Sequence, residues 1–174
     1  VRDALAYLRL AANPSDEVAA RRVVNIPKRG VGDTSLGRVD AWIGAHGTGF
    51  VEGLTHHSEA GVGGRAATGI AAFLDLAAVL AGQVEDGPAT VIEAALDRSG
   101  YLDELRAEGS IEAEGRLENL AELIGVASAY DEVGEFLERV GLVADTDDIP
   151  AGEEGSGDDA GQVLLMTLHA AKGL

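Results

Sequence analysis

Helical periodicity covers almost the whole chain, and no segment before residue 162 alternates apolar and polar residues with the period of a β-strand. The clearest case is residues 64–81, where Ile70, Phe73 and Leu80 recur at helical spacing on a wide apolar stripe. We therefore predict a mainly α, multi-helix domain in which this segment is the central core helix. The other predicted helices cover residues 1–12, 14–24, 34–45, 49–54, 88–98, 101–108, 112–130 and 133–141.

Short polar signals mark where the early helices should begin. Asn13 is a good N-cap residue, and Pro14 suits the first position of the helix that follows it. Asp33 or Thr34 can cap the next helix, which follows a turn that contains two glycines. Local capping chemistry therefore predicts where these helices begin.

The composition limits the class of protein. A chain of 174 residues with 46% apolar residues can bury a core for one domain, or for one domain with pieces of another. It contains no cysteine, which excludes disulfides and thiolate metal sites. No window approaches the roughly 20 uninterrupted apolar residues of a membrane span, and the first residues lack a signal-peptide pattern. We expect a soluble, cytoplasmic protein with no membrane partner.

The charge is strongly acidic but unevenly distributed. The net charge of -17, taken alone, argues against a general nucleic-acid binder, because phosphate contacts rely on lysine and arginine. Residues 21–38, however, contain five basic residues and the single acid Asp33, whereas residues 131–160 contain eleven acids and the single basic residue Arg139. We therefore expect a phosphate-binding surface in the first segment and a solvated acidic surface in the second.

The basic segment contains a Gly-Val-Gly turn at residues 30–32. Glycine lets the backbone approach a phosphate closely, and the amides at the N-terminus of the following helix point toward it. In a helix-hairpin-helix arrangement, the central valine would turn inward and lock the hairpin. A plain turn with a C-capping glycine would also explain one of the glycines, so the residues alone leave both interpretations open. The candidate duplex-DNA contacts are Lys28, Arg29, Gly30, Val31, Gly32 and Thr34.

The end of the chain has a different pattern. Residues 144–161 contain almost nothing apolar and cannot offset the entropy of ordering, which predicts a mobile acidic loop. Residues 162–174 begin with an apolar run of strand length and end in a polar loop. Ligand sites in α/β sheets lie at the carboxyl ends of strands, although a frayed strand end would explain the same residues. The candidate site residues here are Thr167, His169, Lys172 and Gly173.

Other candidate motifs are weaker. The glycine-rich residues 61–69 lack a Gly-Lys-Ser/Thr ending and follow no predicted strand, so they do not form a P-loop. His46, His56 and His57 have no carboxylate at ligand spacing, so we expect no metal site. Trp42 lies on an apolar helix face and is expected in the core.

Four sequence blocks are spread over the whole chain. The first three cover residues 1–16, 22–32 and 115–123, and the fourth is Leu-Met-Thr-Leu-His-Ala-Ala-Lys-Gly-Leu at residues 165–174. In composition and order, these blocks resemble the UvrD/PcrA group of bacterial superfamily 1 DNA helicases. The resemblance implies that the chain is a fragment of an ATP-dependent 3′-to-5′ DNA helicase of the repair or replication type.

The resemblance also implies a domain organisation. Residues 1–12 would end a motor-domain segment, residues 13–143 would form the helical accessory domain called 2B, and residues 144–161 would form the acidic loop. In that family, 2B touches duplex backbone through a Gly-Ile-Gly turn, which residues 30–32 match, and regulates unwinding by rotating relative to the motor. Residues 162–174 would form the return strand and motif V of motor domain 2A, which contacts the tracking single strand.

ATP and Mg²⁺ are implied as cofactors of the parent helicase, and DNA is implied as its partner. The chain lacks the P-loop lysine, the Asp-Glu metal-binding pair and the arginine fingers of the family. We therefore expect no catalytic residue, no metal and no bound cofactor in this fragment. The alternative is an acidic protein-interaction module that binds a repair or transcription protein and in which the glycine turn is only a turn. A steep salt dependence of duplex binding would distinguish the two.

Overall fold

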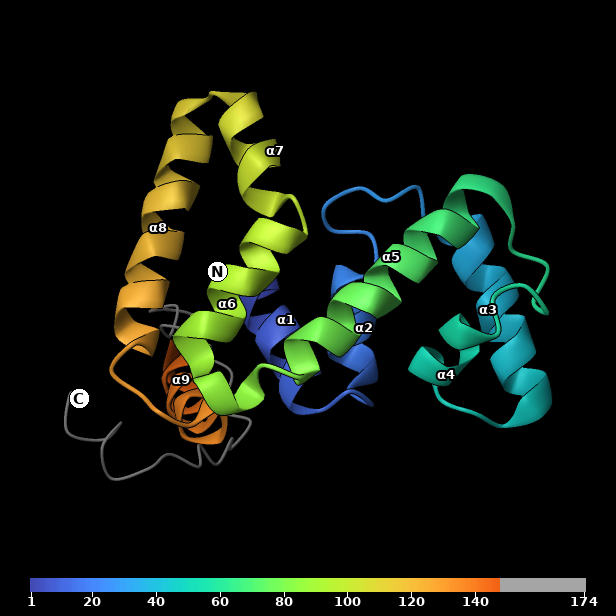
Figure 1. The fold of residues 1–174 in the computed structure, drawn as a ribbon, viewed down its shortest axis with the longest axis horizontal. Helices are drawn as coiled ribbons and strands as arrows, with labels where there is room; N and C mark the ends of the chain where they lie inside the picture. Colours follow the sequence, from blue (N-terminus) through green and yellow to red (C-terminus); the bar gives the residue numbers. More distant parts are fainter. Residues whose placement is uncertain (148–174) are drawn as a thin grey trace, which may run out of the picture. The chain divides into compact units, whose positions relative to one another are not determined.

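The computed structural model describes residues 1–147, and every regular element there is a helix (Figure 1). The chain divides into two compact units, Val1–Phe136 and Leu137–Leu174, and the packing described below is that within the first. The helices are α1 (Arg2–Ala12), α2 (Glu17–Val23), α3 (Asp33–His46), α4 (Phe50–Thr55), α5 (Gly64–Ala81), the 3₁₀ helix η1 (Val84–Asp86), α6 (Pro88–Arg98), α7 (Tyr101–Glu108), α8 (Ile111–Ala127) and α9 (Val133–Asp147).

The predicted mainly α fold is confirmed for the described residues. Helix α5 has the bounds that its apolar stripe predicts, and α6 begins at Pro88, as the preceding glycine suggested. Helix α9 continues to Asp147, so residues 144–147 are helical where the sequence predicted a loop. The rest of the predicted acidic loop and the predicted strand at residues 162–174 lie outside the described residues.

Helix α1 lies at the centre of the first unit, where it packs against α2, α5 and α6 (Figure 1). Its inward residues include Tyr7, which is 1% exposed, and Leu8, which is fully buried. Helix α1 and the helices that it contacts belong to the same compact unit. The assignment of α1 to a motor domain stays a prediction.

Helix α5 connects α4 with α1 and α6, all of which it contacts. Ile70, Phe73 and Leu80 are buried on its inner face, as its periodicity predicts. By length and hydropathy alone, this 18-residue helix would suffice to cross a membrane, and a third of it is buried in the structure. The core helix of a globular domain meets the same criteria. Helix α5 packs against α1, α4 and α6 with its inner face buried, as a core helix does.

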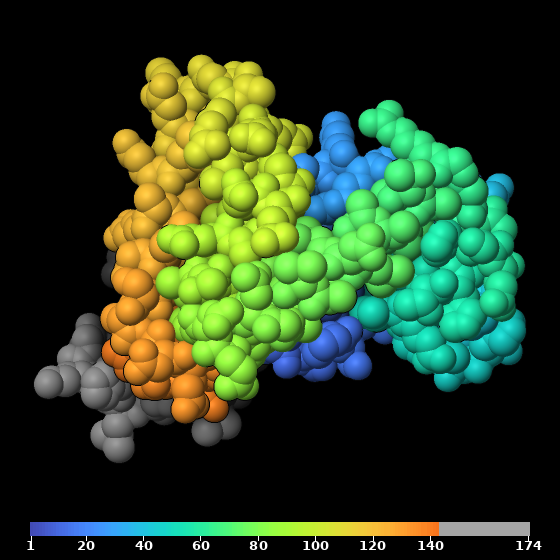
Figure 2. Space-filling view, viewed as in Figure 1, coloured from blue at the N-terminus to red at the C-terminus, as the bar shows by residue number. Residues whose placement is uncertain are grey.

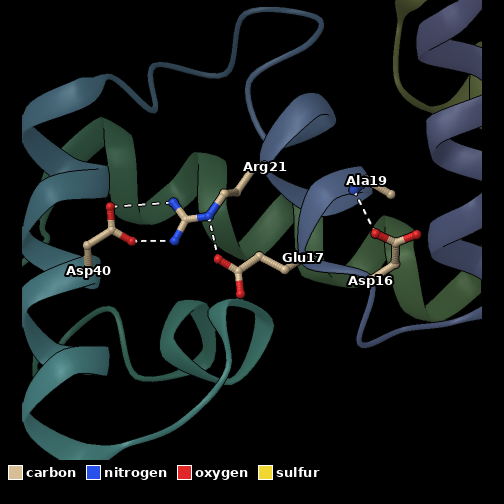
Figure 3. Close-up of polar contacts among 5 residues, drawn as sticks. All are labelled: Asp16, Glu17, Ala19, Arg21 and Asp40. Atoms are coloured by element: carbon tan, nitrogen blue, oxygen red, sulfur yellow. Dashed lines mark hydrogen bonds and ion pairs between the residues drawn. The ribbon is translucent and has the colours of Figure 1, made fainter. Parts of the chain in front are cut away.

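The cap of α2 differs from the prediction. Asp16 is the N-cap, and its Oδ1 accepts a hydrogen bond of 2.9 Å from the backbone N–H of Ala19 (Figure 3). Asn13 instead forms the C-cap of α1. Helix α2 therefore begins at Glu17 and not at Pro14, because the aspartate at the later position satisfies the free amides of its first turn.

Arg21 on α2 contacts both α3 and α4, and Figure 3 shows its bonds to Glu17 and to Asp40 on α3. Its Nε donates to Glu17 Oε1 at 2.7 Å, and its two terminal nitrogens donate to the Asp40 carboxylate on α3, at 2.6 Å for the shorter bond. Its guanidinium carbon lies 4.0 Å from the centre of the Phe50 ring on α4. Hydrogen bonding to Asp40 raises the pKa of Arg21 above its usual value. The α3–α4 pair is thereby linked to α2 by a bidentate ion pair and a cation–π contact.

Candidate nucleic-acid interface

The loop between α2 and α3 presents free backbone amides. Gly30 has a φ of +79°, in the left-handed region that favours glycine, and Gly32 is the N-cap of α3. No side chain caps this helix. Within residues 1–147, the N–H groups of Gly30, Gly32, Asp33 and Thr34 donate to no other protein group. These donors stand at the positive end of the helix dipole, where an anion is stabilised.

Three of the predicted contact residues have the expected positions. Val31 turns inward and is 1% exposed, so its side chain anchors the loop to the core. Lys28 and Thr34 are exposed, so the ammonium and the hydroxyl both face solvent. The loop therefore offers a cation, a hydroxyl and backbone amides around a buried valine.

The expectation that Arg29 adds positive charge at the surface of the turn does not agree with the structure. Its guanidinium is half-buried and points back beneath the loop, where Nη1 donates to the carbonyl oxygens of Val23 and Ile26 at 3.0 Å each. Nη2 donates to the Tyr7 hydroxyl on α1 at 2.7 Å. These bonds use the donors of Arg29 inside the domain, so its guanidinium is not placed to contact a phosphate directly.

Arg65, which the sequence did not single out, lies beside the turn. It is exposed in the first turn of α5, and a Cβ built on Gly30 would lie 2.8 Å from its Cγ and 3.0 Å from its Nε. In Figure 2 the loop, in blue, is exposed on the same face as the start of α5, in green. The segment containing Arg65 resembled only a glycine-rich helix leader, and no local signal pairs it with Gly30.

The remaining basic residues of the segment are already engaged. Arg21 pairs with Glu17 and Asp40, and Arg22 Nε lies 2.8 Å from Asp3 Oδ1 on α1. Arg38 donates from Nη1 to the carbonyl oxygen of Gly61 at 2.6 Å. Lys28 and Arg65 are therefore the cations near the turn whose side chains form neither an ion pair nor a hydrogen bond among the described residues, whereas Arg29 and Arg38 are held by hydrogen bonds to oxygen atoms of the domain.

Acidic side chains gather elsewhere in the first unit. Two pockets of about 480 and 350 Å³ share Glu85 and Asp131 in their walls. Glu132 lines the larger pocket and Asp86 the smaller one. This surface would repel a phosphate, in contrast to the turn before α3.

The other candidate groups do not form a site in the described part of the chain. Trp42 is half-buried rather than in the core, and its ring stacks against His46 at 4.0 Å and His56 at 4.6 Å between centroids. Among residues 1–147 no cluster of His, Asp and Glu could hold a metal ion. The motif V candidates Thr167, His169, Lys172 and Gly173 lie outside the described residues.

The described part of the chain is thus a mainly helical domain that carries unpaired backbone amides and two unpaired cations at one loop. A family model described as the UvrD-like helicase C-terminal domain matches residues 1–56. Over its whole length, the chain is 39% identical to the ATP-dependent DNA helicase PcrA of Bacillus subtilis. It is 39% identical to the ATP-dependent DNA helicase UvrD1 of Mycobacterium tuberculosis and 33% identical to a probable DNA helicase II homolog of Rickettsia conorii.

These matches define the family. The chain belongs to the UvrD/PcrA-like superfamily 1 helicases, and the resemblance seen in the four sequence blocks is confirmed. It spans about a quarter of the length of these relatives, with 24% of PcrA, 25% of UvrD1 and 26% of the Rickettsia protein covered.

Proposed function

We propose that this chain is part of an ATP-dependent 3′-to-5′ DNA helicase of the repair or replication type, and that its helical domain binds the phosphate backbone of duplex DNA. The helicase assignment is supported by the relatives, which are named ATP-dependent DNA helicases. The DNA-binding assignment is supported by one observation: the unpaired amides around Gly30 and Gly32 lie beside two unpaired cations, Lys28 and Arg65.

Each group in this loop has a distinct role in the proposal. The amides of Gly30, Gly32 and Thr34 donate hydrogen bonds to phosphate oxygens, with the Thr34 hydroxyl beside them. Lys28 and Arg65 neutralise the phosphate charge from two sides of the turn. Val31 holds the loop from within. Because these contacts reach only the backbone, binding is independent of base sequence.

The domain corresponds in this proposal to the accessory domain 2B, which would regulate unwinding by rotating relative to the motor. Cytoplasmic localisation follows from that role. Thr167, His169, Lys172 and Gly173 would belong to motif V of the motor and contact the tracking single strand.

ATP and Mg²⁺ would serve the parent helicase and do not fit the described residues. The glycine-rich stretch before α5 has neither a P-loop lysine nor a preceding strand, and within residues 1–147 no carboxylate or imidazole cluster is suited to a metal. Nucleotide chemistry would therefore require other parts of the parent protein. The acidic pockets around Glu85 and Asp131 are where a basic repair or transcription protein would bind in the alternative role.

Salt-dependent binding tests the proposal. The anisotropy of a labelled blunt duplex and of a labelled single strand is measured against the chain at several salt concentrations. Two phosphate-neutralising cations predict a slope of about -2 in log affinity against log salt. Lys28→Gln with Arg65→Gln should flatten that slope, and Gly32→Glu should abolish duplex binding by placing an anion on the amides.

Arg106→Gln is the matched control, because Arg106 is an exposed cation on α7 that pairs only within its own helix. It should leave duplex affinity nearly unchanged. If the Lys28 and Arg65 substitutions weaken binding no more than this control does, the phosphate site is not at the turn.

A further inference from the structure

A half-buried polar network lies beneath the loop that precedes α3. The Arg29 guanidinium donates to carbonyl oxygens of the chain entering the loop, including those of Val23 and Ile26. It also donates to the Tyr7 hydroxyl, which in turn donates to the carbonyl oxygen of Ile26. One side chain on α1 and one in the loop thus bind the same carbonyl.

A second side chain fixes the amides of the loop. Asn25 Oδ1 accepts hydrogen bonds from the backbone N–H groups of Arg29, at 2.8 Å, and Val31, at 3.1 Å. The residue between them is Gly30, whose own N–H is not bound by Asn25. The loop is therefore held by alternate amides, and the intervening amide is left for a ligand.

The network also rests directly on α5. A Cβ built on Gly69 would lie 2.3 Å from the carbonyl oxygen of Arg29, so only glycine allows the loop backbone to approach this closely. The Arg29 guanidinium carbon lies 5.9 Å from the centre of the Phe73 ring. Helices α1 and α5 thus provide the support on which the loop is placed.

The charge of Arg29 has no carboxylate partner. Within residues 1–147 the ion pairs include Arg21, Arg22, Arg106 and Arg116, but not Arg29. Its positive charge is stabilised by carbonyl dipoles and is screened less than a charge in bulk water. The Arg29 network therefore sets the shape of the loop and places a positive charge next to it.

We infer that Tyr7 and Arg29 are positioning residues for phosphate binding, which set the geometry of the Gly30–Thr34 amides without touching the DNA. This inference rests on the proposed function of the turn. A direct contact and a positioning role predict opposite results for conservative substitutions. Lysine preserves a charge that contacts phosphate, but it cannot reproduce the planar fork that binds several carbonyls and a phenol oxygen.

Two variants separate the roles. Tyr7→Phe removes one hydroxyl from a buried residue and changes no charge, and Arg29→Lys keeps the charge but removes the fork. Both should weaken duplex binding by about three- to tenfold while leaving the salt slope unchanged, because the number of neutralised phosphates stays the same. Lys28→Gln, in contrast, should reduce the slope by about one.

Hydrogen–deuterium exchange of peptides covering residues 28–34, measured without DNA, is the second readout. Exchange should be faster in Tyr7→Phe and Arg29→Lys, and unchanged in Lys28→Gln. If Arg29→Lys prevents folding, as judged by circular dichroism, Tyr7→Phe decides the matter because it removes one oxygen atom. Wild-type exchange and affinity in both variants would overturn the inference, as would normal binding by Arg29→Lys together with a flatter slope for Arg29→Gln.

A failure of the proposed duplex binding would give a different result from a failure of this inference. If the wild-type chain does not bind duplex but both variants still accelerate exchange at residues 28–34, the network positions the loop as inferred. The assignment of that loop to duplex DNA would then be wrong.

Discussion

The loop before α3 and the loop before α5 both lead into helices with glycine N-caps and no side-chain cap, yet they are held in different ways. The first is fixed by Asn25 and Arg29, with help from Tyr7 on α1. The second is fixed largely by its own backbone turns, as in the hydrogen bond from Val62 N–H to the carbonyl oxygen of His57 at 2.9 Å. The second loop is also held by Arg38 on α3, whose Nη1 donates to the carbonyl oxygen of Gly61 at 2.6 Å. The first loop should therefore respond to changes in α1 and α5, and the second to changes in α3.

The largest effect should come from Gly69→Ala on α5, which would break the support of the first loop. The new methyl group would lie 2.3 Å from the Arg29 carbonyl oxygen, so backbone must move. We expect a loss of about 2 kcal/mol in the free energy of unfolding, measured with urea. Gly115→Ala on α8 is the control, because nothing lies within 4 Å of its added methyl group.

That control should raise stability by about 0.5 kcal/mol, since alanine is favoured over glycine inside a helix. Equal effects of the two substitutions would show that the loop does not rest on α5 as described.

The next effect compares Gly30→Ala with Gly61→Ala. The two glycines have similar φ values, +79° and +74°. The conformational cost of replacing glycine by alanine, about 1 kcal/mol, should therefore be the same at both positions. Only Gly30 has a neighbour, because its added methyl group meets the Arg65 side chain while that of Gly61 meets nothing. Gly30→Ala should therefore weaken duplex binding by several fold more than Gly61→Ala in the anisotropy measurement.

A smaller effect is expected from Asp40→Asn, which breaks the bidentate pair of Arg21 without touching either loop. Both side chains are partly exposed, 45% for Asp40 and 38% for Arg21, so the loss should be about 0.5–1 kcal/mol. Asp103→Asn is the control, since Asp103 is 81% exposed in its pair with Arg106. Asp103→Asn should change the free energy of unfolding by close to zero in the same urea experiment. A larger loss for Asp103→Asn than for Asp40→Asn would contradict this ranking of the two ion pairs.

The smallest effect concerns alkaline pH. Burial raises the pKa of Tyr7 above its ordinary value of 10.0, so the folded state keeps this proton at a pH where the unfolded state loses it. Stability from Tyr7 is complete below pH 10 and decreases as the pH rises through the folded value. Tyr7→Phe should therefore reduce the alkaline loss of stability. Burial also raises the pKa of Tyr101, so some loss should remain in that variant.

The helices themselves were largely predictable from the sequence. The stripe of α5 and the Gly-Pro start of α6 depend on local periodicity and local backbone preferences, and both agree with the structure. The predicted start of α2 was wrong because Asn13 and Asp16 are both good N-cap residues. In the structure Asn13 ends α1 and Asp16 begins α2.

The candidate site was only partly predictable. The inward position of Val31 follows from its apolar character between two glycines. The direction of Arg29 depends on the close approach permitted by Gly69, and the position of Arg65 depends on how α5 packs. Both are tertiary effects with no signature within a few residues, so counting basic residues between 21 and 38 overestimated the positive surface there.

The stacking contacts of Trp42 give the domain an intrinsic fluorescent probe. Trp42 is the single tryptophan of the chain, and it stacks with His46 on its own helix and with His56, which follows α4. Its emission should therefore respond to separation of α4 from α3, while the tyrosines report elsewhere. A change in tryptophan emission on adding DNA would show that an event at the start of α3 is felt at the far end of the same helix.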